Sequence, residues 1–227
     1  MDQSHPLDRP AWSALKSGWL HLAQGNAQAL RLDPAYGPFG AAADRSEASL
    51  LALAGLIPAG GQLWAVEADA LQPISGTAVL REAPLHQMVA ERLNPLPAKA
   101  EILALGDEDA EEMRALAHLT EPGPFFEKTH KLGSFVGIRK EGVLVAMAGE
   151  RMKIKGFSEV SGVCTHPDHR GHGYAGMLMS IVTERIFARG ETAFLHSYAS
   201  NAGAIALYER LGFVLRKELN AMVLGRA

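Results

Sequence analysis

The chain has 227 residues, of which 48% are apolar and 21% are charged, a balance typical of a soluble globular protein. A formal net charge of −3 gives no electrostatic reason to expect binding to nucleic acid or to an anionic membrane. The single cysteine, Cys164, excludes an internal disulfide framework and fits a reducing cytoplasm. We therefore expect a cytoplasmic protein, since we find no secretory signal and no apolar run long enough to cross a bilayer.

The first hundred residues predict a small region of mixed helices and strands. The spacing of apolar residues predicts helices over residues 13–30, 46–56 and 85–93. Ser46 is a suitable N-cap for the second of these helices. Short apolar runs predict strands over residues 63–67 and 77–81.

The proline-rich segment Asn94-Pro95-Leu96-Pro97 separates this region from a longer one, so we expect a domain boundary between residues 1–97 and 98–227. The second region predicts strands over residues 101–105, 133–139, 143–150, 159–165, 193–198, 214–217 and 221–224. It predicts helices over residues 107–119, 173–189 and 201–211. This order predicts an α/β (α+β) fold in which meander strands precede a β-α-β crossover.

The most informative segment joins a predicted strand to a predicted helix through a turn that contains Gly171 and Gly173. The start of a helix presents unpaired backbone N–H groups and a partial positive charge, and both favour a phosphate. Glycines leave no side chain in the way of such a ligand and permit unusual backbone angles. Arg170 adds a positive charge, so the segment predicts a ligand with a pyrophosphate group, although a plain glycine loop is the simpler alternative.

Two nucleotide-binding patterns can be compared with this segment. The chain has no G-x-x-x-x-G-K-[ST] sequence, which disfavours a P-loop nucleotidase. Gly171-x-Gly173-x-x-Gly176 matches the dinucleotide fingerprint, but residues 166–170 separate it from the preceding strand. The next predicted strand also ends without the carboxylate that would bind a ribose. An NAD-binding oxidoreductase therefore stays a weaker alternative.

Two segments match motifs of one known family. Arg170-x-x-Gly173-x-Ala175 fits an Arg/Gln-x-x-Gly-x-Gly/Ala signature. Residues 200–213 contain an asparagine, a tyrosine and a Tyr-x-x-x-Gly-Phe ending, in the right order and one helix and one strand further on. Together they resemble motifs A and B of the GNAT superfamily of N-acyltransferases, over about residues 100–227. The resemblance implies a mixed, largely antiparallel sheet flanked by helices. Some members carry a degenerate second copy of the fold, which is one interpretation of residues 1–97.

The resemblance also implies that acetyl-CoA is the acyl donor. In GNAT proteins the strand before the glycine turn pairs with the pantetheine arm, and the N–H groups of the turn hold the pyrophosphate. The matching positions here are Val163, Cys164, Thr165, Arg170, Gly171, His172, Gly173, Tyr174, Ala175 and Gly176. Asn201 corresponds to the asparagine that contacts the pantetheine or fixes the splay of the strands, and it equally suits a simple N-cap.

Tyr208 and Glu159 are the residues for which the resemblance implies catalytic roles. Family members use the tyrosine as a general acid on the departing thiolate, and a phenol and a thiol have pKa values close enough to share a proton. Many relatives place a glutamate base where Glu159 stands, on the strand that leads to the glycine turn. Glu159 shares a strand face with Thr165 unless a β-bulge intervenes. His196 is the second candidate for the base.

A metal site is a weak alternative. Cys164, His166, His169 and His172 are closely spaced, but no Cys-x-x-Cys or His-Glu-x-x-His pattern accompanies them. Cys164 is not needed as a nucleophile, because direct transfer requires no covalent intermediate. We predict that no metal is required.

The sequence thus predicts an acyl-CoA-dependent N-acyltransferase, in which an amine attacks the bound thioester directly. Phe125, Phe126 and Phe157 are candidates for lining an apolar acceptor pocket. A non-catalytic acyl-CoA-binding or regulatory module is the main alternative. The acceptor amine, the acyl chain and the role of residues 1–97 stay open, and a homodimer is compatible with the resemblance because dimers are common in the family.

Overall fold

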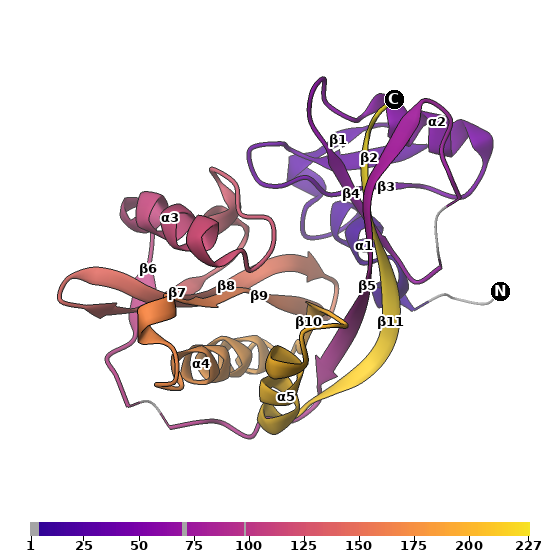
Figure 1. The fold of residues 1–227 in the computed structure, drawn as a ribbon. Helices are drawn as coiled ribbons and strands as arrows, with labels where there is room; N and C mark the ends of the chain where they lie inside the picture. Colours follow the sequence, from indigo (N-terminus) through magenta and orange to yellow (C-terminus); the bar gives the residue numbers. More distant parts are fainter. Residues whose placement is uncertain (1–4, 70–71, 98) are drawn as a thin grey trace.

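The structure, a computed structural model, describes residues 5–69, 72–97 and 99–227 (Figure 1). Residues 1–4 and 98, which fall at the starts of the two predicted domains, lie outside the described residues, as do residues 70–71. Among the described residues, no helix is long and apolar enough to cross a membrane.

An eight-stranded sheet forms the centre of the fold, in the spatial order β4-β11-β5-β10-β9-β8-β7-β6 (Figure 1). In the described sheet only β9 and β10 run parallel to each other, and the other neighbouring pairs are antiparallel, which confirms the predicted sheet type. The strands are β4 (Leu63–Glu67), β5 (Thr77–Ala90), β6 (Leu103–Leu105), β7 (Phe135–Lys140), β8 (Val143–Ile154), β9 (Phe157–Thr165), β10 (Thr192–Tyr198) and β11 (Phe213–Arg226).

Helices cover both faces of this sheet, with α3 on one face and α4 and α5 on the other (Figure 1). The bounds are α3 (Ala110–Thr120), α4 (Tyr174–Ala188) and α5 (Ala202–Leu211). On the α3 face, Met113 and Leu116 pack against Met147 and Cys164. On the other face, the apolar side of α4, including Leu178, forms the largest core cluster with the inner strands. The middle of the sheet is therefore buried on both faces.

A smaller N-terminal sheet, β1-β2-β3, packs beside the main sheet with two short helices (Figure 1). The elements are α1 (Pro10–Leu15), β1 (Ala23–Gly25), β2 (Ala29–Leu32), β3 (Gly40–Ala42) and α2 (Glu47–Gly55). Short 3-10 turns lie at Pro6–Asp8, Leu20–Leu22, Asp107–Asp109, Thr129–Leu132 and Pro167–His169. The predicted N-cap of α2 is confirmed, because Ser46 Oγ accepts the Ser49 N–H at 3.3 Å.

Strand β5 comes from the N-terminal part of the chain, yet it lies between β10 and β11 in the main sheet. Leu85 to Ala90 pair with β10 on one side, and residues 77–90 pair with β11 on the other. The expected boundary at residues 97 and 98 thus falls in a connection between two strands of one sheet. A separate role for residues 1–97 stays a prediction, but these residues supply part of the central structure.

Strands β9 and β10 separate part of the way along their length. Three residue pairs join them, ending with Phe194 opposite Glu159. Beyond this point β9 continues to Thr165 and β10 to Tyr198, and no further pairing between them occurs in these described strands. A β-bulge on β9 lies in the diverging part, where the register with β8 shifts and Gly162 has a φ of 63°. The strands therefore form a V whose opening faces the start of α4.

Three predicted elements are wrong, for identifiable reasons. Residues 85–93 were expected to be helical, but they mostly lie in β5, whose apolar side chains point to two buried faces and so imitate helical spacing. The helix expected over residues 13–30 ends at Leu15, because Gly18 packs directly against Lys153 and Gly25 has a φ of 128°. The two short strands expected after residue 213 are one continuous strand, β11, with a register shift after Leu215.

Candidate active site

A cleft of about 540 Å³ opens at the mouth of the V formed by β9 and β10. It is bounded by the end of β9, the glycine turn, the start of α4 and one side of α5. The sequence-predicted residues that line it are Val163, Cys164, Thr165, Arg170, Gly171, Gly173, Tyr174, Ala175, Gly176, Asn201 and Tyr208. The structure thus brings two separate sequence motifs to one surface.

The glycine turn presents a series of unpaired backbone donors to this cleft. Gly171 and Gly173 have φ angles of 82° and 76°, in the left-handed region that favours glycine, and Gly173 is the N-cap of α4. Within the described residues, the backbone N–H groups from Gly171 to Gly176 have no hydrogen-bond acceptor. A Cβ added at Gly171 would meet no protein atom, so the space beside it is open. These features fit a pyrophosphate group and supply it with donors and a partial positive charge.

Gly176 has a different role from the first two glycines. A Cβ at this position would lie 2.5 Å from Cδ1 of Leu96 and 3.2 Å from Cδ1 of Leu207. Leu96 belongs to the connection that follows β5. The backbone N–H of Leu96 donates to Ser180 Oγ at 3.0 Å. The connection thus packs against α4 and α5, and Leu96 lines the cleft. No local pattern in the sequence points to this role of Leu96.

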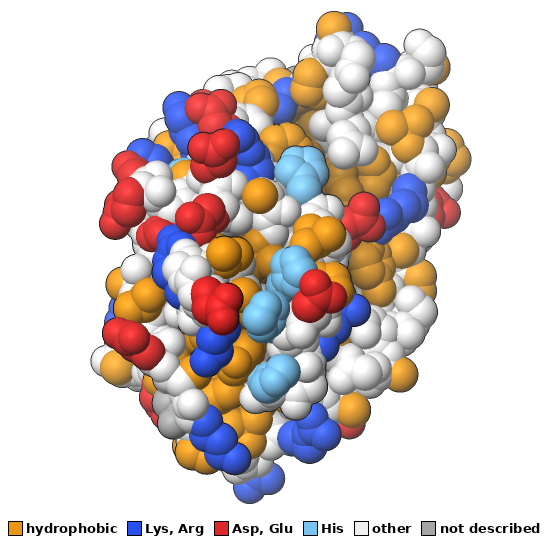
Figure 2. Space-filling model, turned by 60° about the vertical axis from the view of Figure 1, so that its left-hand side comes forward, with side chains coloured by type: hydrophobic (Ala, Val, Ile, Leu, Met, Phe, Trp, Pro, Cys, Tyr) orange, Lys and Arg blue, Asp and Glu red, His pale blue; other side chains and the backbone are white. Residues whose placement is uncertain are grey.

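The side chains around the turn fall into two groups. Arg170 is exposed and lines the cleft, where its charge can face an anion. His172 does not line it, because its Nδ1 lies 3.0 Å from the Arg170 carbonyl and its ring stacks on Tyr174 with 5.4 Å between ring centres. His172 can therefore contribute its backbone N–H, as predicted, while its side chain supports the turn. Figure 2 shows histidine side chains gathered along this side of the molecule, among charges of both signs.

Asn201 caps α5 and also lines the cleft. Its Oδ1 accepts the Ala204 N–H at 3.2 Å, which is the N-cap geometry. It borders two adjoining hollows, one on the side of the glycine turn and one on the side of β4 and β10. Both predicted interpretations of Asn201, as a cap and as a residue that faces the ligand, agree with this position.

Tyr208 lies two turns along α5 from Asn201 and lines the same two hollows. Burial raises the pKa of Tyr208 above its usual value, so the hydroxyl is protonated at neutral pH. The described part of the chain provides no hydrogen-bond partner for this hydroxyl. A protonated and uncommitted hydroxyl at this place can donate a proton to a neighbouring group.

Glu159 lies at the vertex of the V and not in its opening. Its carboxylate accepts hydrogen bonds from Arg151 Nε and Nη2 at 2.9 and 2.8 Å, and from the Met152 N–H at 3.2 Å. His196 Nδ1 is 2.8 Å from Oε1 of the same carboxylate. The side chain is 1% exposed, and the Arg151 charge and these hydrogen bonds hold the pKa of Glu159 far below its usual value despite the burial. A carboxylate that already takes part in this many hydrogen bonds is a poor proton acceptor, which counts against the predicted role of Glu159 as the base.

A chain of polar side chains continues from His196 to the protein surface. Gln87 Nε2 is 3.0 Å from His196 Nε2 and donates to the Leu7 carbonyl at 2.9 Å. Gln87 Oε1 accepts from Arg216 Nε, and Arg216 is paired with Asp8. Because His196 Nδ1 faces a carboxylate and its Nε2 faces an amide donor, the arrangement places a proton on Nδ1 and leaves Nε2 as the acceptor. The lone pair of His196 Nε2 then already accepts the hydrogen bond from Gln87 Nε2.

Cys164 and the nearby histidines are the residues of the alternative metal site. Burial raises the pKa of the Cys164 thiol to about 11, and its side chain packs in the core on the α3 face. Among the described residues, no three His, Cys, Asp or Glu side chains lie close enough together to hold a metal ion. Cys164 also lacks the thiolate character that a nucleophile needs.

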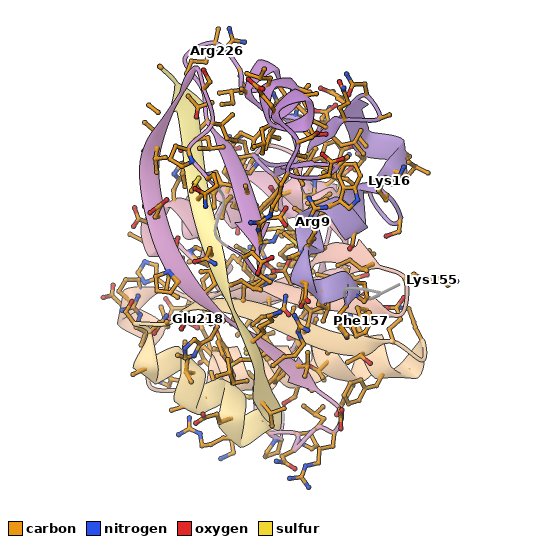
Figure 3. All side chains as sticks on the ribbon, turned by 90° about the vertical axis from the view of Figure 1, so that its right-hand side faces the viewer. Arg9, Lys16, Lys155, Phe157, Glu218 and Arg226 are labelled. Carbon is orange, nitrogen blue, oxygen red and sulfur yellow. The ribbon has the colours of Figure 1, made fainter. Side chains whose placement is uncertain are left out.

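A further hollow, separate from the one beside Asn201 and with a volume of about 520 Å³, adjoins the V on the side of α3 and β4. Phe125 and Phe126 line it, as the sequence suggested. Phe157 does not: it packs in the core beside the N-terminal segment, 5.5 Å from the ring of His5, near Lys155 (Figure 3). Trp64 from β4, Arg81 from β5 and Tyr198 from β10 complete much of the wall. Residues from the N-terminal part of the chain thus reach the site.

Glu121 is the acidic residue that the sequence analysis missed as an individual candidate. It ends α3 in the left-handed conformation, with a φ of 48°, where glycine is the usual residue. It is exposed, and it lines the cleft at the glycine turn, the hollow beside Asn201 and the larger hollow beside α3. Glu121 is therefore at the junction of the three. In the sequence, Glu121 belongs to no motif and stands directly before the Pro122-Gly123-Pro124 segment.

Comparisons with known proteins agree with this geometry. The sequence model of the family described as FR47-like protein matches residues 135–221. A crystal structure assigned to the GNAT acetyltransferase family, from Novosphingobium aromaticivorans, is 48% identical over 99% of this chain and 100% of that chain, with a TM-score of 0.91. A GCN5-related N-acetyltransferase from Kribbella flavida is 23% identical over 95% and 93% of the two chains, with a TM-score of 0.65, and shows the fold alone. No curated protein matches the chain.

Proposed function

The chain belongs to the GNAT family of acetyltransferases, and from this premise we propose that it transfers an acetyl group from acetyl-CoA directly to an amine. The observation that carries the proposal is the row of unpaired backbone N–H groups from Gly171 to Gly176, which opens onto the V between β9 and β10. Tyr208 lies at the same opening. This arrangement supplies a binding site for a pyrophosphate and a proton donor within one cleft.

On the donor side, the backbone of the glycine turn would hold the pyrophosphate, with Arg170 adding charge. The exposed backbone of Val163, Cys164 and Thr165, where β9 has lost its parallel neighbour, would pair with the pantetheine arm. Asn201 would hold the start of α5 against the same arm. The chain's main contribution is then to fix the thioester in line with the amine, which lowers the entropic cost of a two-substrate reaction.

We assign the general acid to Tyr208. The departing group is a thiolate, whose conjugate thiol has a pKa of about 8.5, so a proton must reach it near neutral pH. Tyr208 is the protonated hydroxyl that lines the cleft without a partner in the described chain. Donation from Tyr208 would complete the release of CoA as the neutral thiol.

We assign the proton acceptor to Glu121 in place of the predicted Glu159. Glu159 is enclosed and fully hydrogen-bonded, and the Nε2 electron pair of His196 faces Gln87. Glu121 is an accessible carboxylate at the junction of the cleft and the hollow beside α3, where an amine would have to pass. Glu159 would then act as a clamp at the vertex of the V, holding β8 to β10 through Arg151 and His196.

Release of CoA measured with acetyl-CoA and a panel of amines tests this function. We expect turnover with at least one amine and none with NAD as a hydride acceptor. Glu121→Gln should lower kcat/KM at least tenfold, whereas Glu141→Gln, the matched variant at the other left-handed glutamate, should leave it unchanged. Binding of acetyl-CoA without turnover of any amine would favour a non-catalytic acyl-CoA-binding module. The cytoplasmic location and a homodimer stay predictions.

A further inference from the structure

The hollow beside α3 has an uneven distribution of charge. Arg81, Arg114 and His118 line it, together with one acidic residue, Glu121. Aromatic rings from three separate parts of the chain form the rest of its wall: Trp64, Phe125, Phe126 and Tyr198. An apolar acceptor pocket, as the sequence suggested, accounts for the rings but not for the arginines.

Arg81 is held in place without a carboxylate. Its guanidinium carbon lies 5.6 Å from the centre of the Trp64 ring and 4.9 Å from the centre of the Tyr198 ring. Within the described residues, no acidic side chain forms an ion pair with Arg81. Contacts with two rings restrict the orientation of the guanidinium and leave its N–H donors available. Arg81 is therefore a positioned cation on the wall of the hollow.

Two further donors lie in the same wall. The indole N–H of Trp64 is buried and has no acceptor in the described chain. Arg114 projects from α3 and is also free of ion pairs there, although it borders a neighbouring hollow that contains Asp107, Glu108, Glu111 and Glu127. Arg81 is consequently the better-isolated cation on this wall, and the Trp64 ring helps to orient it. A guanidinium is a suitable donor to a carboxylate.

The charges are also ordered along the site. Arg81 and Arg114 line the hollow beside α3 but not the cleft at the glycine turn. Glu121 lines both. An acceptor that placed its ammonium group beside Glu121, near the thioester, would direct the rest of the molecule toward Arg81. A group of negative charge at that distal end would be stabilised, and a second ammonium group there would be repelled.

We propose that the acceptor is an amine that carries a carboxylate, such as a free amino acid or the end of a short peptide, with its ammonium group at Glu121 and its carboxylate at Arg81. This inference rests on the proposed acyl transfer and names the acceptor class for the same site. A bidentate pair between a guanidinium and a carboxylate accounts for the choice of arginine at position 81. The aromatic walls then bind the carbon skeleton between the two charged groups.

Matched acceptors test the proposal on the unmodified protein. CoA release is measured with amino acids, with the corresponding amides, and with aminoalkyl phosphonates, at saturating acetyl-CoA. We expect kcat/KM for the carboxylates to exceed that for the amides at least tenfold. Equal or better turnover of the amides, or a preference for the phosphonates, would overturn the carboxylate assignment while leaving acyl transfer in place. No turnover of any amine would overturn both.

A substitution at Arg81 then locates the effect. Arg81→Gln should raise KM for the carboxylate acceptors about tenfold, with little change for the amides and none in KM for acetyl-CoA. Arg185→Gln, at an exposed arginine on α4 that lines none of the described hollows, is the matched control and should change neither value. An equal rise in KM for carboxylates and amides in Arg81→Gln would show a general loss of shape and contradict the proposal.

Discussion

The two sides of the site are built in different ways. The cleft for the donor consists largely of backbone groups from one short stretch, residues 163–176, completed by one side of α5. The hollow beside α3 consists of side chains from β4, β5, β10 and the segment that follows α3, which are distant in the sequence. Glu121 and the V between β9 and β10 connect the two. The clamp formed by Glu159, Arg151 and His196 lies at the vertex of this V, and Arg151 and His196 line the hollow beside Asn201.

This difference suggests how the two sides can change independently. A site made of N–H groups at a helix start recognises any ligand with a pyrophosphate and depends on backbone angles more than on side chains. A site made of side chains from several elements can alter its specificity through single substitutions, because each residue contributes its own charge and shape. We therefore expect variants of the first kind to affect acetyl-CoA and variants of the second kind to affect the amine.

The largest effect is expected at the clamp. Glu159→Gln would leave Arg151 as a buried charge without its partner, which costs about 3–5 kcal/mol when one member of such a pair is removed. The free energy of unfolding from urea titration should fall by roughly this amount. Glu112→Gln, which removes an exposed carboxylate from the ion pair with Arg139, should cost less than about 1 kcal/mol. A similar small cost in both variants would mean that Glu159 is not a clamp.

The pH dependence of stability tests the same clamp from another direction. Because the folded-state pKa of Glu159 is depressed, its contribution is fully present above its unfolded pKa of about 4.3 and is lost as pH falls toward the folded value. The difference in unfolding free energy between the wild type and Glu159→Gln should be constant from about pH 6 to 8 and shrink below about pH 4. A difference that instead grew on acidification would contradict the depressed pKa.

The next effect concerns the chemistry between the two sides. Tyr208→Phe removes the proposed acid and should lower kcat roughly 100-fold, in the range that a positioned acid contributes. Binding of acetyl-CoA, measured by calorimetry, should change little because the ring remains. Tyr36→Phe, at a tyrosine that lines none of the described hollows, provides the control. An unchanged kcat would remove Tyr208 from the mechanism.

A pair of glycine variants isolates the donor side. Gly171→Ala and Gly190→Ala place a Cβ at φ angles of 82° and 73°, with no protein atom within 4 Å in either case. Both should lose a similar free energy of unfolding, about 1–2 kcal/mol, from the left-handed conformation. Only Gly171→Ala should weaken acetyl-CoA binding, by roughly tenfold if about 1.4 kcal/mol of phosphate contact is lost. Equal Kd values in the two variants would separate the glycine turn from the cofactor.

The smallest effect is expected at Arg170. Its side chain is exposed, so its attraction to a phosphate is reduced by solvent and salt. Arg170→Ala should raise the Kd for acetyl-CoA by no more than about fivefold, since surface charge pairs contribute up to about 1 kcal/mol, and the difference should shrink at high salt. A tenfold or larger loss that salt did not reduce would show that Arg170 has a more enclosed role.

The parts of the site that the sequence predicted are those with a local physical signature. The glycine turn could be recognised because left-handed φ angles and a helix start require particular residues at fixed spacing. Tyr208 and Asn201 followed from a motif on one helix. The fold class and the β-α-β crossover also depend on local patterns, and the structure confirms them.

The parts that could not be predicted depend on long-range packing. Residues 85–93 have helical spacing, but insertion between β10 and β11 makes most of them a strand with two buried faces. Glu159 was proposed as the base from its place on the strand, and only the approach of Arg151 and His196 from neighbouring strands encloses it. Arg81 becomes a candidate only because β4, β5 and β10 lie in one sheet, since its two ring partners come from different strands.

The most direct test of the central claim is the thermal stability of the purified protein with acetyl-CoA, with NAD as the control. At a concentration of 100 Kd, a ligand that binds only the folded state adds about 2.7 kcal/mol to its stability. For a chain of this size that increase corresponds to a rise in Tm of about 5–10 °C. We predict such a rise with acetyl-CoA and none with NAD. A rise with NAD alone would contradict the account, as would no rise with acetyl-CoA in protein shown by mass spectrometry to be free of CoA.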